Sequence, residues 1–209
     1  MRNLILASSS RYRQAQLAAL GVNAEAIAAD IDESPFPEEK PDVLAARLAA
    51  AKASKVSALK PEAIVIGSDQ VACLNSPDGR HILGKPGCHS KAVKQLSLCQ
   101  GRSVIFYSAL SLACKSSGKQ VTETDITTVH FTTLSQRQIE DYLRAETPYD
   151  CAGSFKSEGK GVLLFDAIES RDPNALIGLP VMLLRDLLIH FEVDLLALAT
   201  ANLSNAAAT

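Results

Sequence analysis

The sequence predicts an α/β fold in which helices flank a mixed central β-sheet. Two observations lead to this prediction. Short apolar runs alternate with helical runs early in the chain, and two long β-rich runs joined by a turn follow midway. The 209 residues are 47% hydrophobic and 21% charged, which is typical of a globular protein with a substantial core. We expect a single domain over residues 1–195 and a flexible tail over residues 196–209.

The first half of the chain is divided by glycine, proline and turn signals. A five-residue apolar run predicts a buried strand, and Gly21 is suited to end the helix that follows it. After a proline-rich loop, Leu44 and Leu48 step along one face of a long helix. A second buried strand has Asp69 just past its end, and the turn SPDGR comes next. The two strand segments cover residues 3–7 and 63–69, the two helices cover 11–20 and 42–59, and the turn covers 76–80.

The second half begins with a short helix that Gly101 ends. Two β-rich runs then flank the turn KSSGK, a pattern that predicts an antiparallel hairpin. Ser135 and Gln138 form a capping-box pattern that opens another helix. A polar loop, a strand and a final helix with Pro180 in its first position follow. The helices of this half cover residues 90–99, 136–146 and 180–191. The strands cover residues 103–114, 122–134 and 162–168, and the polar loop covers residues 147–161.

Composition excludes several classes of protein. A net charge of -2 gives no general attraction to nucleic acid or to an anionic membrane, so any phosphate binding must be local. No apolar run reaches the roughly 20 residues that span a bilayer, and the start of the chain does not resemble a signal peptide. Five cysteines without a C-x-x-C pair and four scattered histidines favour reduced thiols in a cytoplasmic protein rather than disulfides or zinc.

The stretch LILASSSRYR combines a strand end, three serines and two arginines. Backbone N–H groups, hydroxyls and the positive end of a helix together form an anion site, and a guanidinium binds phosphate in a bidentate way. The alternative is that Ser10 only caps the helix and that Arg11 and Arg13 are solvated.

A second polar strand end carries Asp69. If the two strands are neighbours, Asp69 lies near the serines, and a carboxylate beside a polyphosphate requires a divalent cation between them. Glu33, in the acidic DIDES stretch, is a second candidate ligand for this Mg²⁺ or Mn²⁺. Lys52 and Lys85 would offset phosphate charge. The alternatives are a turn-forming role for Asp69 and solvated surface charges for the other three.

Seven motifs appear in order: LILASSSRYR, DIDES, RLAAAKA, VIGSDQV, ILGKP, CAGSFKSEGKG and RDPNALIGLP. Together they resemble the Maf-like nucleoside triphosphate pyrophosphatases over residues 4–191. The forms SDQV and GSFKSEG most resemble the branch that hydrolyses 7-methyl-GTP, whereas the branch for dTTP and UTP typically reads ADTVV and has glutamine in place of Glu158. The resemblance implies an inosine-triphosphatase-like fold with a deep cleft, cleavage between the α- and β-phosphates, a divalent cation and a homodimer.

The resemblance also implies roles for individual residues. Asp69 matches the catalytic acidic residue. Phosphate-side positions match Ser8, Arg13, Lys52 and Lys85, and positions that set base choice match Tyr12, Gln70 and Glu158. The family usually has proline at the position of Arg11, and some relatives have tryptophan at the position of Tyr12.

The chemistry of 7-methylguanine agrees with roles for Tyr12 and Glu158 in recognising the base. N7-methylation gives guanine a positive ring, which stacks on an aromatic face such as that of Tyr12. The N1–H and N2–H donors of guanine suit the carboxylate of Glu158, whereas uracil or thymine suits an amide better. The alternatives are helix-face packing for Tyr12 and a plain loop charge for Glu158.

Three other functions compete with 7-methyl-GTP hydrolysis. One is a pyrophosphatase for UTP, dTTP or other modified nucleotides. Another is a nucleotide-sensing module that binds without turnover. A serine hydrolase using Ser10 lacks the G-x-S-x-G elbow in this chain.

Overall fold

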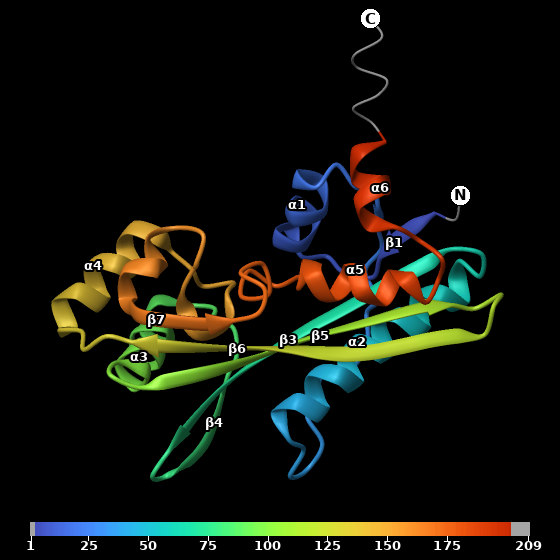
Figure 1. Ribbon diagram of the computed structural model, residues 1–209. Helices are drawn as coiled ribbons and strands as arrows, with labels where there is room; N and C mark the ends of the chain where they lie inside the picture. Colours follow the sequence, from blue (N-terminus) through green and yellow to red (C-terminus); the bar gives the residue numbers. More distant parts are fainter. Residues whose placement is uncertain (1–2, 202–209) are drawn as a thin grey trace, which may run out of the picture.

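The computed structural model describes residues 3–201 as one mixed β-sheet with helices on both faces (Figure 1). The strand order is β2-β1-β3-β5-β6-β7, and β4 pairs with β3. β1 runs parallel to both neighbours and the other pairs are antiparallel, which confirms the predicted mixed sheet. The strands are β1 (Leu4–Leu6), β2 (Glu25–Ala26), β3 (Ile64–Ser76), β4 (Gly79–Leu83), β5 (Ser103–Cys114), β6 (Lys119–Phe131) and β7 (Phe165–Ser170).

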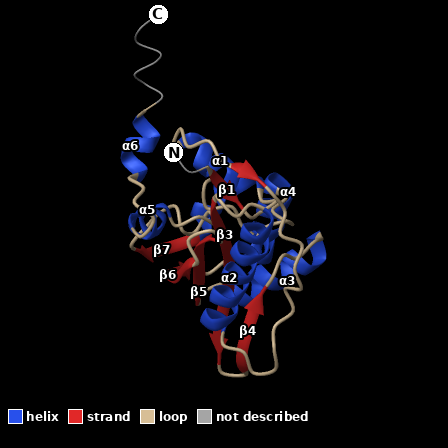
Figure 2. Cartoon of the chain, turned by 90° about the vertical axis from the view of Figure 1, so that its right-hand side faces the viewer, coloured by secondary structure: helices blue, strands red, loops and turns tan. Residues whose placement is uncertain are grey.

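The helices cover different parts of this sheet. α2 packs on one face, while α1, α5 and α6 lie over one end of the opposite face and α3 and α4 lie at the other end (Figures 1 and 2). None of the described helices is both long and apolar enough to cross a membrane. The helices are α1 (Arg11–Ala19), α2 (Pro41–Leu59), α3 (His89–Cys99), α4 (Gln136–Glu146), α5 (Val181–Ile189) and α6 (Leu195–Thr200), with 3₁₀ turns η1 (Ala152–Ser154) and η2 (Lys160–Leu164).

Local signals in the sequence explain where the helices begin and end. The predicted capping box is present: Gln138 N donates to Ser135 Oγ, and Ser135 N donates to Gln138 Oε1 at 2.8 Å. Gly21 follows α1 with a φ of 71°, a left-handed conformation that glycine adopts without steric cost. The hairpin of β5 and β6 also forms as predicted.

Two large apolar clusters occupy opposite ends of the long strands. One contains Phe106, Phe131 and Phe155, whose rings meet edge to face, and lies against α3 and α4. The other contains Ile66 and Leu110 and lies against α1, α5 and α6. Because β3 and β5 contribute to both clusters, the continuous strands hold the two ends of the molecule in register.

Several elements differ from the sequence prediction, and β6, for example, begins and ends three residues earlier than expected. β3 does not end before Asp69 but continues to Ser76, because residues 65–74 pair with β5 and residues 72–76 pair with β4. β7 begins three residues later than expected, after a 3₁₀ turn. The helix predicted as the last, 180–191, is followed by α6, which Asp194 caps and Leu195 anchors in the core. Of the predicted tail, residues 202–209 lie outside the described residues.

Candidate active site

An interruption along one edge of β3 creates the candidate site. On this edge, pairing with β1 ends at Ile66 and pairing with β4 begins only at Ala72. A cavity of about 800 Å³ lies at the gap and is lined by Ser8, Asp69 and other residues. Successive side chains of a strand point to opposite faces of the sheet. A cavity at an open strand edge can therefore be lined by side chains from both faces.

The structure brings all nine sequence-predicted site residues together around this one cavity. The expected proximity of the serine-rich turn to Asp69 is therefore confirmed, and β1 and β3 are parallel neighbours. The nine residues are Ser8, Tyr12, Arg13, Glu33, Lys52, Asp69, Gln70, Lys85 and Glu158.

The serine-rich turn joins β1 to α1 and is fixed by hydrogen bonds between residues two or three positions apart. Ser10 N donates to Ser8 Oγ at 3.1 Å, and Ser10 Oγ caps α1 by accepting from Arg13 N at 3.5 Å. Ser10 thus has the capping role that was the alternative for this stretch. Arg11 is exposed and lines the cavity, in the position where an N-terminal proline would otherwise preset the helix.

Arg13 joins three segments of the chain and is not solvated as the alternative had it. Its Nη1 donates to Ser68 O on the open edge of β3 at 2.8 Å, and its Nε donates to Gly178 O at 2.9 Å. Burial lowers the pKa of Arg13, and the nearby carboxylates of Asp69 and Glu33 oppose that shift. Nη2 makes no hydrogen bond within the described residues, so its two protons are available to a ligand.

Lys52 is the centre of the acidic cluster in the cavity. Its Nζ lies 2.6 Å from Asp69 Oδ1 and 2.6 Å from Glu33 Oε1. The Lys52 and Asp69 side chains are 10% and 12% exposed, whereas Glu33 is 59% exposed. Lys52 is therefore not a solvated lysine, and Asp69 is not a turn residue. Glu33 is more than half exposed but is paired with Lys52.

The charges around the cavity do not balance a polyphosphate. Five carboxylates and four cationic side chains line it, so the lining is not basic overall. A triphosphate bound there needs additional positive charge. Two carboxylates that converge on one ammonium are also an oxygen donor set suited to Mg²⁺ or Mn²⁺, with phosphate oxygens as further ligands. Within residues 3–201 no group of three or more acidic, histidine or cysteine side chains is clustered for a metal, so a ligand would have to complete the coordination.

The segment carrying Glu33 is attached to α2 through Arg47. The Arg47 guanidinium makes two bonds to Glu39, at 2.7 and 2.8 Å, and donates to Ser34 O at 3.0 Å. It also lies over the ring of Phe36, 4.1 Å from the centroid. Because Lys52 follows Arg47 by five residues on the same helix, α2 positions both the lysine and the segment that bears its acidic partner.

Gln70 faces away from Lys52, toward the segment that precedes α5. Its Nε2 donates to Ala175 O at 2.9 Å and to Ser108 Oγ at 3.0 Å. The amide nitrogen is thereby engaged with the protein, and the carbonyl oxygen Oε1 is the part of Gln70 left for a ligand.

Tyr12 connects α1 to the loop between α4 and η1. Its hydroxyl lies 3.3 Å from each carboxylate oxygen of Asp150, and Cys151 Sγ is 3.6 Å from the same hydroxyl. Burial raises the pKa of Tyr12, with further contributions from Cys151 and Asp150. No described aromatic ring or cation stacks on Tyr12. Lys85 and Glu158 are exposed residues of the lining.

Several lining residues were not assigned to the site from the sequence, and the polar ones include Asp30, Asp150 and Ser157. Asp150 directly precedes the quoted motif that contains Glu158, and Ser157 lies within that motif. Ser157 Oγ is buried without a hydrogen-bond partner among the described residues. The signal for Asp150 was its place in the polar loop of residues 147–161. Nothing in a single sequence distinguishes it from a solvated acid.

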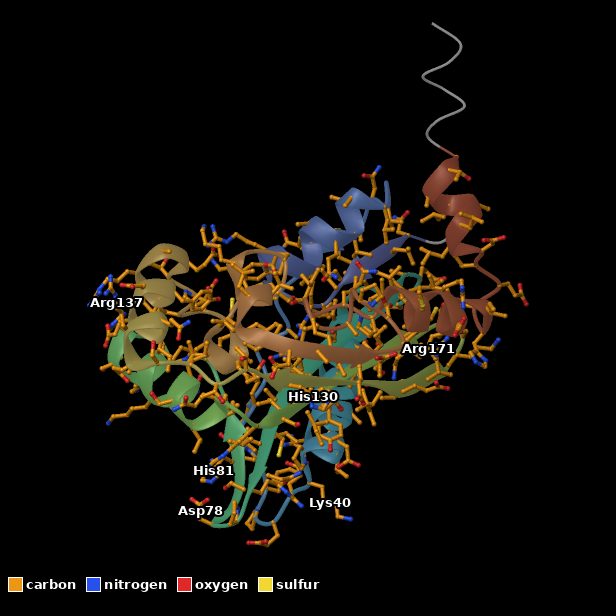
Figure 3. All side chains as sticks on the ribbon, turned by 60° about the vertical axis from the view of Figure 1, so that its left-hand side comes forward. Lys40, Asp78, His81, His130, Arg137 and Arg171 are labelled. Atoms are coloured by element: carbon orange, nitrogen blue, oxygen red, sulfur yellow. The ribbon has the colours of Figure 1, made fainter. Side chains whose placement is uncertain are left out.

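The serine-hydrolase alternative is not supported by the described residues. None of the histidines lines the cavity, so Ser10 has no imidazole base there. His81 lies on the β4 hairpin and His130 on β6, both labelled in Figure 3. His89 is bound to Tyr149 and Glu140 at 3.0 and 2.7 Å.

The model of the Maf family, which is described as Maf-like protein, matches residues 3–191 of this chain. The 7-methyl-GTP pyrophosphatase of Nitrosococcus oceani is 49% identical, over 88% of this chain and 91% of its own. Proteins of the same name from Albidiferax ferrireducens and Burkholderia lata are 51% and 50% identical, over 87% and 93% of this chain and 89% and 92% of theirs. A solved HAM1 protein from Coxiella burnetii aligns with a TM-score of 0.39 at 14% identity, over 63% of this chain and 73% of its own, a similarity too low to define the fold by itself. The family match over nearly the whole chain, together with relatives about half identical to it, establishes that this protein is a member of the Maf-like family.

Proposed function

We propose that this protein hydrolyses nucleoside triphosphates between the α- and β-phosphates, with 7-methyl-GTP as its preferred substrate and 7-methyl-GMP and pyrophosphate as products. The observation that carries the proposal is the contact of Lys52 with both Asp69 and Glu33 beside the serine-rich turn. The names of the relatives, which are about half identical over most of their length, support the same substrate.

In the proposed reaction, the triphosphate lies along the turn that carries Ser8 and Arg13, where Arg13 Nη2 is available. Asp69 orients the attacking water through Oδ2, which no hydrogen bond within the described residues engages. Water oxygen bonds to the α-phosphorus, the bond to the bridging oxygen breaks, and pyrophosphate leaves. Because an aspartate carboxylate is a weak base, positioning and charge stabilisation supply most of the rate.

A divalent cation is part of this proposal. Glu33 and Asp69 would hold Mg²⁺ or Mn²⁺ and share it with the phosphates, where it would neutralise charge that develops on the leaving group. Lys52 keeps the two carboxylates converged before the nucleotide arrives, and Lys85 adds a cation from the opposite loop.

At the base end, the proposal uses the face of Tyr12 to stack the purine. Glu158 accepts from guanine N1–H and N2–H, and Gln70 Oε1 offers a further acceptor. The cationic ring of 7-methylguanine favours this set over a pyrimidine.

A single comparison tests the proposal against its rivals. Pyrophosphate release is measured with Mg²⁺ and 7-methyl-GTP, GTP, UTP or dTTP. We expect the highest kcat/KM for 7-methyl-GTP. A preference for UTP or dTTP would favour the pyrimidine alternative, and saturable binding without release from any nucleotide would favour a sensing module.

The homodimer and the cytoplasmic location belong to the proposal as well. They are supported by the resemblance and by the cysteine usage. Light scattering in solution tests the first, and cell fractionation tests the second.

A further inference from the structure

We propose that Asp150 determines specificity at the base end of the cavity, by adding a negative charge that favours a cationic purine over a neutral one. The inference rests on the proposed function and deepens it. It concerns a residue that neither the motif pattern nor the charge pattern of the sequence assigned to the site.

The contact between Asp150 and Tyr12 is the first argument. The two residues are 138 positions apart in the chain, yet both Asp150 oxygens lie 3.3 Å from the Tyr12 hydroxyl. The shared contact holds the ring at its far end while its face carries no described aromatic or cationic partner. In this contact the Tyr12 hydroxyl is the donor and the Asp150 carboxylate is the acceptor.

The distribution of charge is the second argument. Asp69 and Glu33 are both in contact with Lys52, so their charges are offset within the protein. Asp150 and Glu158 line the same cavity, and neither makes an ion pair with a cationic side chain within the described residues. Asp30 is a third lining carboxylate without an ion pair among the described residues, and it lies in a different segment. Two of the three unpaired negative charges of the lining therefore lie on the loop that contacts Tyr12, where a positive ring gains and a neutral ring does not.

Two substitutions separate charge from tethering. Asp150→Asn removes the charge but keeps an amide oxygen that accepts from Tyr12. Tyr12→Phe keeps the ring and the charge but removes the tether. Asp166→Asn is the matched control, because Asp166 is an exposed acid on β7 that does not line the cavity.

The experiment measures kcat/KM for 7-methyl-GTP and for GTP in the wild type and the three variants. For Asp150→Asn we expect the ratio of the two values to fall about threefold to tenfold, as one solvent-accessible charge contributes about 1 kcal/mol. For Tyr12→Phe we expect KM to rise for both nucleotides with the ratio kept within about twofold. Asp166→Asn should leave the ratio at its wild-type value.

Three results would overturn the inference. One is an equal loss with both nucleotides in Asp150→Asn, which would make Asp150 a purely structural residue. Another is an equal fall of the ratio in Tyr12→Phe, which would assign the selectivity to ring orientation. The third is a wild-type enzyme that releases pyrophosphate without preferring 7-methyl-GTP. Absence of release from every nucleotide would instead overturn the proposed function itself.

Discussion

Lys52 Nζ lies 2.6 Å from Asp69 Oδ1 in a largely buried contact between α2 and β3. The same nitrogen is 2.6 Å from Glu33 Oε1, so one ammonium organises the acidic part of the cavity. Lys52 holds Asp69 and Glu33 together before any nucleotide binds. Each carboxylate can be replaced by its amide, so their roles can be tested separately.

The first prediction concerns Asp69. Asp69→Asn keeps an oxygen that accepts from Lys52, so we expect the fold to persist, with an unchanged circular dichroism spectrum. We expect kcat for 7-methyl-GTP to fall by about 10²-fold or more, because the variant loses the carboxylate that orients water. A variant with near-normal kcat would contradict the assignment of Asp69 as the catalytic acid.

The second prediction concerns the cation and Glu33. We expect chelation of divalent ions to abolish turnover and Mg²⁺ to restore it. In Glu33→Gln the Mg²⁺ concentration for half-maximal rate should rise about tenfold, with part of kcat recovered at high Mg²⁺.

Asp32→Asn is the matched control for Glu33. Asp32 precedes Glu33 but accepts from Ser34 N and does not line the cavity. Equal Mg²⁺ requirements in wild type and Glu33→Gln would remove Glu33 from the ligand set.

The third prediction concerns the close packing of α2 on β3. A Cβ at Gly67 would lie 2.2 Å from Ala49 O and 2.7 Å from Ala53 N, both in the backbone of α2. We expect Gly67→Ala to lower the free energy of unfolding by about 1–3 kcal/mol or more, and Tm by about 3–10 °C. Gly84→Ala is the control, because its Cβ would meet nothing within 4 Å. Equal Tm values for the two variants, measured by calorimetry, would disprove the packing argument.

The fourth prediction concerns acid stability. Arg47 holds the pKa of Glu39 at about 2, below its ordinary 4.5. A carboxyl whose pKa is lowered by folding stabilises the protein above the unfolded value, and this contribution is lost as pH falls from about 4.5 toward 2. We therefore expect Glu39→Gln to lower the urea midpoint at pH 7, with the difference from wild type shrinking below pH 4.5.

The neighbouring Glu38→Gln provides the control for this titration, because Glu38 is exposed and only Glu39 bonds to Arg47. A difference between wild type and Glu39→Gln that stays constant from pH 7 to pH 3 would show that the charge of Glu39 does not act through Arg47.

Most elements follow from local sequence signals. The capping pair Ser135 and Gln138 fixes the start of α4 through hydrogen bonds between near neighbours, so no distant contact is needed. Asp69 was misplaced relative to its strand, because GSD resembles a turn and only pairing with β5 extends β3 through it. α6 was missed although its leucines and alanines are good helix formers and Asp194 caps it, because six residues are too few for a stable helix without the core contact of Leu195.

The sequence by itself determined the mixed α/β class and the family resemblance, since these depend on residue identity and local periodicity, and the resemblance, together with the chemistry of the residues, named the nine candidate site residues. Tertiary structure alone decided that β3 has an open edge, that Arg13 bonds to Ser68 there, that Lys52 joins Glu33 to Asp69, and that Asp150 meets Tyr12. The physical reason is that each of these contacts joins segments whose separation in the chain says nothing about their separation in space. The register of the strands, the packing of α2 and the placement of α1 beside the loop that carries Asp150 bring these groups to within hydrogen-bond distance.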